Sequence, residues 1–184
     1  MTSPAIQALR AEHSHALELF DSLTEAEWAL PSGCAGWRVQ DVAQHMASTF
    51  HSIADPSSIE TGNTPAVDEV KAEYREWSET GIVALAGLQE PPMADMVIPI
   101  ANLGSHPMRL LGNAIAFDHY CHLRHDIGAA VRRAADLPHD PLVLEATIEW
   151  MLAGIPQMCT AALAACDTGV NLVFTDLRHS VHTL

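Results

Sequence analysis

A histidine-rich stretch, Asp118–Asp126, has residue types and a spacing that suit a metal ion. A helix turns by about 100° per residue, so Asp118, His122 and His125 project from one face of it. Imidazole nitrogens and carboxylate oxygens bind zinc, nickel or iron at about 2.0–2.2 Å, and ligands at i and i+4 on a helix chelate one ion. The stretch therefore predicts a metal site with His122 among its ligands.

Other registers stay open on the same helix. His119, His122 and Asp126 form an overlapping stripe rotated by one residue, and Cys121 precedes His125 by four residues. His122 belongs to both stripes and is the first choice. The second-choice ligands, or residues that support the ligands, are His119, Cys121, His125 and Asp126. A metal-free alternative is a solvated histidine-rich face, or histidines that are hydrogen-bonded in the core.

A single histidine far upstream is a candidate partner for this stretch. His45 lies between Val42 and Met46 in another predicted helix, near its apolar face. An unpaired imidazole there costs free energy. Bundles build metal sites from side chains on facing helices, so an imidazole from this helix fits the pattern. His13 and His15, two residues apart, cannot share a helix face and receive no role.

The composition indicates a helical domain that does not bind nucleic acid. The chain has 184 residues, 48% of them hydrophobic and only 5% aromatic, so its core is mainly aliphatic, which suits helices. Twenty-three acidic residues against nine basic ones give a formal charge of −14, whereas a nucleic-acid binder needs a basic face. The four cysteines form no CxxC pair and are expected to be reduced thiols.

No segment marks the chain as a membrane or secreted protein. It contains no apolar run of about eighteen residues, the minimum for a membrane span. Its N-terminus lacks the basic and apolar regions of a signal peptide. We therefore expect a cytoplasmic location and no membrane partner.

Apolar periodicity and helix signals predict five helices, at about 4–23, 39–53, 64–88, 108–135 and 142–165. Ser3 as N-cap and Pro4 at the first helical position fit the first start. The proline-rich connection 91–107 is long enough to suggest that it lines a site. Residues 169–175 alternate like a strand. The prediction is an all-α, up-down four-helix bundle with one extra helix, comprising residues 1–167, followed by a β-like tail, 168–184.

The run from Glu27 to Ala47 contains Trp28, a proline turn and then Gly36-Trp37-x-Val-x-Asp-Val-x-x-His45. This pattern resembles the signature of the mycothiol-dependent maleylpyruvate isomerase family, which belongs to the DinB-like metalloproteins. The resemblance extends over about residues 5–165 and implies a four-helix bundle with a divalent metal, usually zinc, held by three side chains.

The resemblance also implies a ligand set. The second-helix histidine of the family corresponds to His45, and an acidic residue or histidine followed four residues later by histidine corresponds to Asp118 and His122, with Asp in place of the more usual Glu or His. An aspartate shortly after the last histidine corresponds to Asp126. The tail resembles the first strand of the family's small C-terminal domain.

Three classes of function follow. In the first, the metal activates a low-molecular-weight thiol, mycothiol or bacillithiol, as a cosubstrate for S-transfer to, or isomerisation of, an electrophilic substrate. Arg124 or Arg109 would then pair with a substrate carboxylate. In the second, the chain is a non-catalytic, metal-binding regulatory bundle that acts as a homodimer. A structural bundle without metal is the third alternative.

Overall fold

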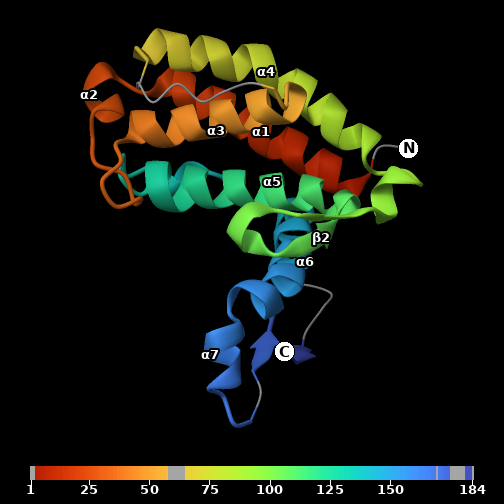
Figure 1. Ribbon diagram of the computed structural model, residues 1–184. Helices are drawn as coiled ribbons and strands as arrows, with labels where there is room; N and C mark the ends of the chain where they lie inside the picture. Colours follow the sequence, from red (N-terminus) through yellow and green to blue (C-terminus); the bar gives the residue numbers. More distant parts are fainter. Residues whose placement is uncertain (1–2, 58–64, 169, 175–180, 184) are drawn as a thin grey trace.

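The computed structural model describes residues 3–57, 65–168, 170–174 and 181–183, and its main elements are helices (Figure 1). The α-helices are α1 (Pro4–Ser22), α2 (Glu25–Trp28), α3 (Val39–Ala54), α4 (Val67–Gly87), α5 (Leu111–Cys121), α6 (Pro141–Met158) and α7 (Thr160–Ala164). A π-helical segment, η4 (His122–Gly128), continues α5. Short 3₁₀ turns are η1 (Met93–Asp95), η2 (Ala101–Leu103), η3 (Met108–Leu110) and η5 (Ala134–Asp136).

Among the described residues, four short strands form two antiparallel pairs. β1 (Val97–Pro99) pairs with β2 (Ser105–Pro107), and β3 (Asn171–Val173) pairs with β4 (Val181–Thr183). The protein therefore has the all-α, DinB-like helical fold that the sequence predicts, with a short β-like end. Of the predicted tail strand, Gly169 and Thr175 lie outside the described residues.

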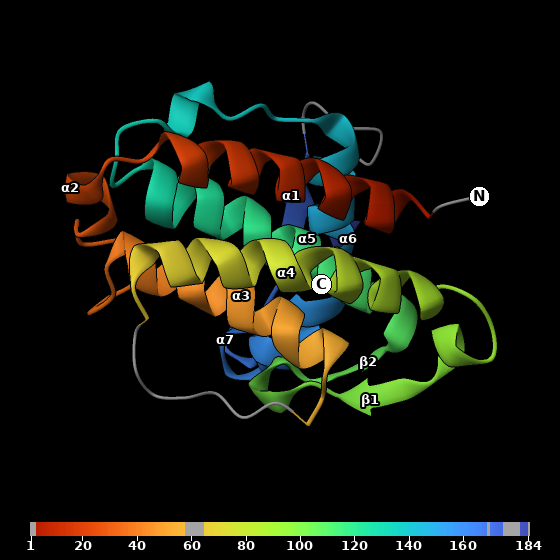
Figure 2. The ribbon, with the colours of Figure 1, turned by 90° about the horizontal axis from the view of Figure 1, so that it is seen from above.

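The long helices α1, α3, α4 and α5 pack as a bundle with an up, down, down, up order, which corrects the predicted up-down alternation (Figures 1 and 2). α3 and α4 run in the same direction, since Gln40 bonds to Pro65 near their starts and His51 stacks on Trp77 further along. α1 is antiparallel to α4, as the bond from His13 to Ser78 and the Lys71–Asp21 ion pair indicate. α5 runs antiparallel to α3 (Figure 2). The middle of α3 therefore faces the end of α5, where the histidine-rich stretch begins.

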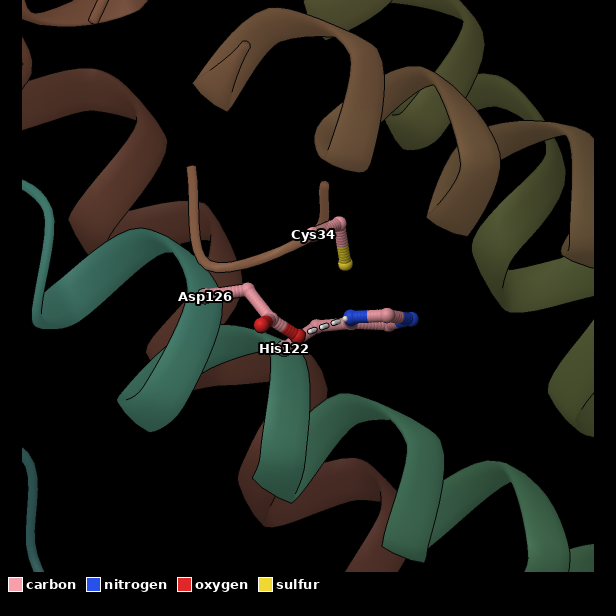
Figure 3. A group of neighbouring side chains, drawn as sticks. All are labelled: Cys34, His122 and Asp126. Atoms are coloured by element: carbon pink, nitrogen blue, oxygen red, sulfur yellow. Dashed lines mark hydrogen bonds and ion pairs between the residues drawn. The ribbon is translucent and has the colours of Figure 1, made fainter. Parts of the chain in front are cut away.

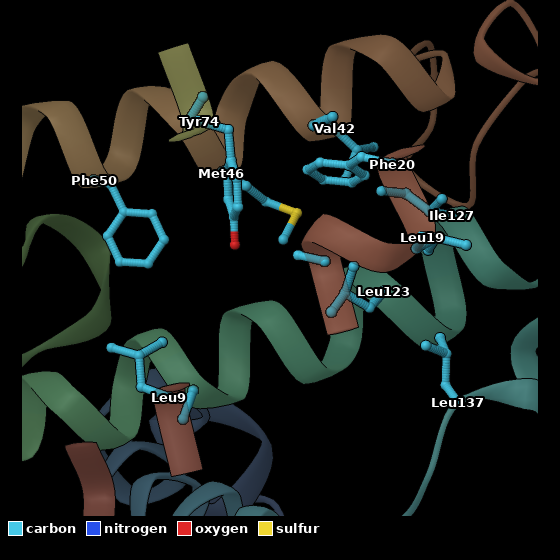
Figure 4. Packing of buried hydrophobic residues seen from close by; sticks show 14 of the residues in the cluster. Leu9, Leu19, Phe20, Val42, Met46, Phe50, Tyr74, Leu123, Ile127 and Leu137 are labelled. Atoms are coloured by element: carbon cyan, nitrogen blue, oxygen red, sulfur yellow. The ribbon is translucent and has the colours of Figure 1, made fainter. Parts of the chain in front are cut away.

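The core lies between these four helices and excludes water from one side of the histidine-rich stretch (Figure 4). Its largest fully buried side chains include Phe20 from α1, Met46 and Phe50 from α3, Tyr74 from α4 and Leu123 from η4. Each such side chain contributes about 1.5–3 kcal/mol by leaving water. The apolar periodicity that predicted the helices thus also identifies the helix faces that pack against one another in the core.

Helix starts agree with the sequence better than helix ends. The Ser3 hydroxyl accepts a bond from the Ile6 amide, and Pro4 is the first residue of α1, as predicted. The predicted start of the third helix, Thr64, lies outside the described residues, and α4 begins at Val67. The predicted helix 108–135 is instead η3, α5 and η4 followed by turns, and 142–165 is divided at Cys159 into α6 and α7.

The connection 91–107 forms the β1–β2 hairpin. The Ser105 amide donates a hydrogen bond to Gln157 Oε1 of α6 at 2.8 Å, and Gln157 Nε2 donates one to the Ser105 carbonyl at 3.0 Å. The hairpin thus anchors α6, and whether it lines a site stays a prediction. None of the helices in the described part of the chain has the length and apolar character of a membrane span.

Candidate metal centre

Three predicted ligands converge where α3 faces α5. Ligand atoms of His45, Asp118 and His122 all lie within 4.8 Å of one another. Asp118 Oδ1 is 3.2 Å from His122 Nε2 and 3.6 Å from His45 Nε2. The two imidazole rings are 5.2 Å apart and nearly perpendicular, at 82°. Of the two helical stripes that the sequence left open, the structure directs the one with Asp118 and His122 toward His45.

These separations fit a shared ion better than hydrogen bonds alone. Ligands about 2.0–2.2 Å from a tetrahedral ion lie about 3.3–3.6 Å from each other, close to the 3.2 and 3.6 Å that separate Asp118 Oδ1 from the two imidazole nitrogens. At 3.6 Å, His45 Nε2 is too far from Asp118 Oδ1 for a good hydrogen bond. Asp118 Oδ2 is buried and without a hydrogen-bond partner among the described residues. The donor set, two imidazoles and a carboxylate, suits zinc, nickel or iron.

The site is open on one side. The side chain of His45 is 37% exposed and that of Asp118 25%, whereas that of His122 is 15% exposed. An ion held by three protein ligands at such a place keeps a position for an outside molecule, as catalytic metal sites do and closed structural sites do not.

The charges around Asp118 favour its carboxylate form. Burial raises the pKa of this carboxyl group, but the imidazoles of His119, His122 and His45 outweigh burial and hold the pKa well below its usual range. For His122, burial lowers the pKa, and the carboxylates of Asp118 and Asp126 outweigh it, so that the pKa is raised. The site therefore attracts positive charge, which a divalent cation supplies as well as a proton does.

His122 is oriented from its other side by Asp126. Its Nδ1 lies 2.7 Å from Asp126 Oδ2, so an Nδ1–H donated to this carboxylate leaves the Nε2 lone pair facing Asp118 and His45. The two residues are four apart, a spacing that makes side chains neighbours on a helix, and both lie in the π-helical segment η4. The bond from the Ala129 amide to the Arg124 carbonyl, at 3.0 Å, is one of its i to i+5 bonds.

A loop before α3 covers this end of η4. The Gly33 amide donates to the Asp126 carbonyl at 3.1 Å, and a Cβ at Gly33 would lie only 2.5 Å from Asp126 Oδ1. Glycine therefore permits the contact. The sulfur of the next residue, Cys34, lies within 4.8 Å of a ligand atom of His122 and of Asp126. Burial, then the Asp126 carboxylate, raises the pKa of the Cys34 thiol.

The sequence motif around this loop belongs to a known domain. Residues 9–95 match the family model of the mycothiol maleylpyruvate isomerase N-terminal domain. This part of the chain belongs to that family. The matched region includes Cys34, Trp37 and His45 and ends before Asp118 and His122, so the α5 half of the candidate centre comes from the structure alone. No curated protein and no solved structure matches the chain significantly.

The second-choice ligands have different surroundings. His119 is fully buried and bonds to the Ile115 carbonyl at 3.0 Å and to the Tyr74 hydroxyl at 3.2 Å. His125 is exposed, with its ring 6.4 Å from that of Tyr120. Cys121 is half-buried, and burial raises the pKa of its thiol to about 11. Of the second-choice residues, Asp126 bonds to His122, and His119 Nδ1 lies 3.6 Å from Asp118 Oδ2.

The two arginines proposed for a substrate carboxylate are engaged elsewhere. Arg124 is buried in an ion pair with Glu12, at 2.6 and 3.0 Å, and also bonds to the Pro138 carbonyl. Arg109 pairs with Asp95 at 2.9 Å and precedes His122 by thirteen residues, about 20 Å along a helix axis. Neither guanidinium faces the candidate centre in this arrangement.

Two residues near the site escaped prediction from the sequence. Trp37, noted in the sequence only as part of the family motif, is 41% exposed, and its ring lies 5.6 Å from that of His45. Cys34 was counted only as a reduced thiol. Both lie in the motif before α3. For Trp37, the short distance in sequence to His45 could have indicated that it lies near the site. No spacing rule connects Cys34 to a helix almost ninety residues later.

We expect Asp126→Ala to weaken divalent-metal binding by about 10–100-fold, the usual effect of removing the carboxylate that orients a ligating histidine. The measurement is a zinc titration of metal-free protein against a competing chelator. Asp95→Ala is the matched control, because that carboxylate is exposed and pairs with Arg109. Equal zinc affinity in the two variants would contradict the orienting role.

Proposed function

We propose that the chain binds one divalent metal, with zinc as first choice, through His45, Asp118 and His122. The observation that carries this proposal is the convergence of these three side chains, one from α3 and two from α5 and its continuation η4, with ligand atoms all within 4.8 Å of one another. Membership of residues 9–95 in a mycothiol maleylpyruvate isomerase domain family supports the same conclusion from the sequence.

We further propose that the site uses a low-molecular-weight thiol, mycothiol or bacillithiol, for S-transfer or isomerisation. A divalent metal lowers the pKa of a thiol that reaches it and so supplies a nucleophile at neutral pH. The residues of this chain have supporting roles: Asp118 contributes negative charge, Asp126 orients His122, and the exposed face of His45 leaves room for the thiol. Trp37 beside His45 offers an apolar wall for an incoming molecule.

The proposal predicts both metal content and thiol-dependent turnover. Protein purified without a histidine tag should contain about one equivalent of a divalent metal, and it should conjugate mycothiol or bacillithiol to a generic electrophile faster than the uncatalysed reaction. His45→Ala should lose thiol-dependent turnover and the metal held at this three-ligand site, because it removes one of the three ligands. Thr49→Ala on the same helix, whose hydroxyl donates to the His45 backbone carbonyl, is the matched control.

Stoichiometric metal with no thiol-dependent turnover would favour the second class of function, a metal-binding regulatory bundle. Wild-type protein without metal, even after incubation with zinc, cobalt or nickel, would contradict the metal centre itself.

A further inference from the structure

A second group of ligand-type side chains shares His122 with the candidate metal centre. Cys34, His122 and Asp126 offer a sulfur, a nitrogen and an oxygen that lie within 4.8 Å of one another. Cys34 comes from the loop before α3, and the other two come from η4, as Figure 3 shows. The Cys34 sulfur points toward the edge of the imidazole ring that bonds to Asp126 (Figure 3).

The donor atoms of this group are softer than those of the first. A thiolate with an imidazole and a carboxylate suits zinc, cobalt or cadmium and favours the more thiophilic ions. The three side chains are partly buried, so the site is sheltered and still accessible to an ion. The close backbone approach of Gly33 to Asp126 holds the cysteine loop against η4.

His122 can serve only one of the two groups at a time. A neutral imidazole carries one proton and one free lone pair on its two nitrogens. With the proton on Nδ1, donated to Asp126 at 2.7 Å, Nε2 faces Asp118 and His45. With the proton on Nε2, 3.2 Å from Asp118 Oδ1, the Nδ1 lone pair faces Asp126 and Cys34.

We infer that Cys34, His122 and Asp126 form a second, thiolate-containing site for a divalent metal, which is occupied as an alternative to the His45, Asp118 and His122 site. Binding there displaces the thiol proton of Cys34 to solvent and forms the metal–sulfur bond, with no change in oxidation state. The inference rests on the proposed function only in that the two sites share His122. A thiophilic ion would then divert His122 from the first site.

The test is cobalt binding to the metal-free His45→Ala variant, which lacks a ligand that only the first site uses. We expect a thiolate-to-cobalt absorption band that saturates near one equivalent. The band should fall to background in His45→Ala/Cys34→Ser and remain in His45→Ala/Cys159→Ser, the matched control with an exposed cysteine removed. A folded His45→Ala protein without the band, or a band that survives Cys34→Ser, overturns the inference.

Wild-type protein tests the alternation and separates it from the proposed function. Total divalent metal should stay near one equivalent when cadmium is added to zinc-loaded protein, and a thiolate-to-cadmium band should grow as zinc leaves. Two equivalents bound together overturn the alternation. Cys34→Ser should retain its zinc. If Cys34→Ser loses its zinc whereas His45→Ala keeps it, the result supports the thiolate site and contradicts only the proposed site of His45, Asp118 and His122.

Discussion

His122→Ala should remove the bound divalent metal from the protein. His122 is the ligand that both candidate sites share, so no alternative set of three side chains remains among the described residues. We expect a loss of affinity greater than about 100-fold, because removing a ligand costs more than the 10–100-fold that removing its supporting partner costs. Elemental analysis of the purified variant and a zinc titration of the metal-free form measure this loss.

Thermal unfolding provides an independent measurement of the same ligand. A free zinc concentration one hundred times Kd stabilises the folded state by about 2.7 kcal/mol, which raises the Tm of a chain of this size by about 5–10 °C. The wild type should show this rise and His122→Ala should not. His125→Ala is the matched control, because His125 lies in the same segment and is exposed. His119→Ala is a poorer control, since its ring is fully buried against the core.

A rise in Tm that is the same in His122→Ala and the wild type would contradict both metal sites. A rise that is lost in His125→Ala and kept in His122→Ala would instead favour the register in which Cys121 and His125 act as a pair. The experiment therefore distinguishes the helical registers that remained open from the sequence.

The sequence predicted the helices, the N-cap at Ser3 and the contact of Asp118 with His122, because these features are local. The N-cap at Ser3, the apolar stripes and the i, i+4 relation of Asp118 to His122 depend on neighbouring residues. The family motif added His45, and residues 9–95 do belong to the mycothiol maleylpyruvate isomerase N-terminal domain family. That these side chains meet depends on the antiparallel packing of α3 on α5, which the structure supplies.

The departure from a regular helix was not predictable in the same way. With α-helical geometry, His125 follows Asp118 and His122 on one stripe, and Asp126 lies on the other. His122 belongs to both stripes, and in the structure it contacts Asp118 from the first and Asp126 from the second, whereas His125 is exposed. Gly33, which approaches Asp126, and Glu12, which pairs with Arg124, both contact η4, and both contacts are long-range.

The buried ion pair between Arg124 and Glu12 connects the candidate site to the stability of the fold. Arg124 lies between His122 and Asp126 in sequence, and its guanidinium is held by Glu12 of α1 and the Pro138 carbonyl. The side chains are 3% and 0% exposed. A charge buried to this degree must be paired, because losing one partner leaves the other without either water or a counter-ion.

Arg124→Met should therefore lower the free energy of unfolding by about 3–5 kcal/mol, the usual cost of leaving one member of a buried pair unpaired. Denaturant unfolding followed by circular dichroism measures the change. Arg10→Met is the matched control: Arg10 also pairs with a glutamate of another helix, Glu79, but the side chains are 43% and 57% exposed, and we expect a loss of less than about 1 kcal/mol.

Glu12→Leu/Arg124→Met should recover most of the stability that Arg124→Met loses, because it removes both charges from the core. Metal affinity provides the second measurement. If the ion pair holds η4 in its π-helical register, the double variant should bind zinc more weakly than the wild type although its stability is restored, since His122 and Asp126 then lack the anchor between them. A double variant with wild-type zinc affinity would limit Arg124 to stabilising the fold, and the register of η4 would then depend on the Gly33 contact.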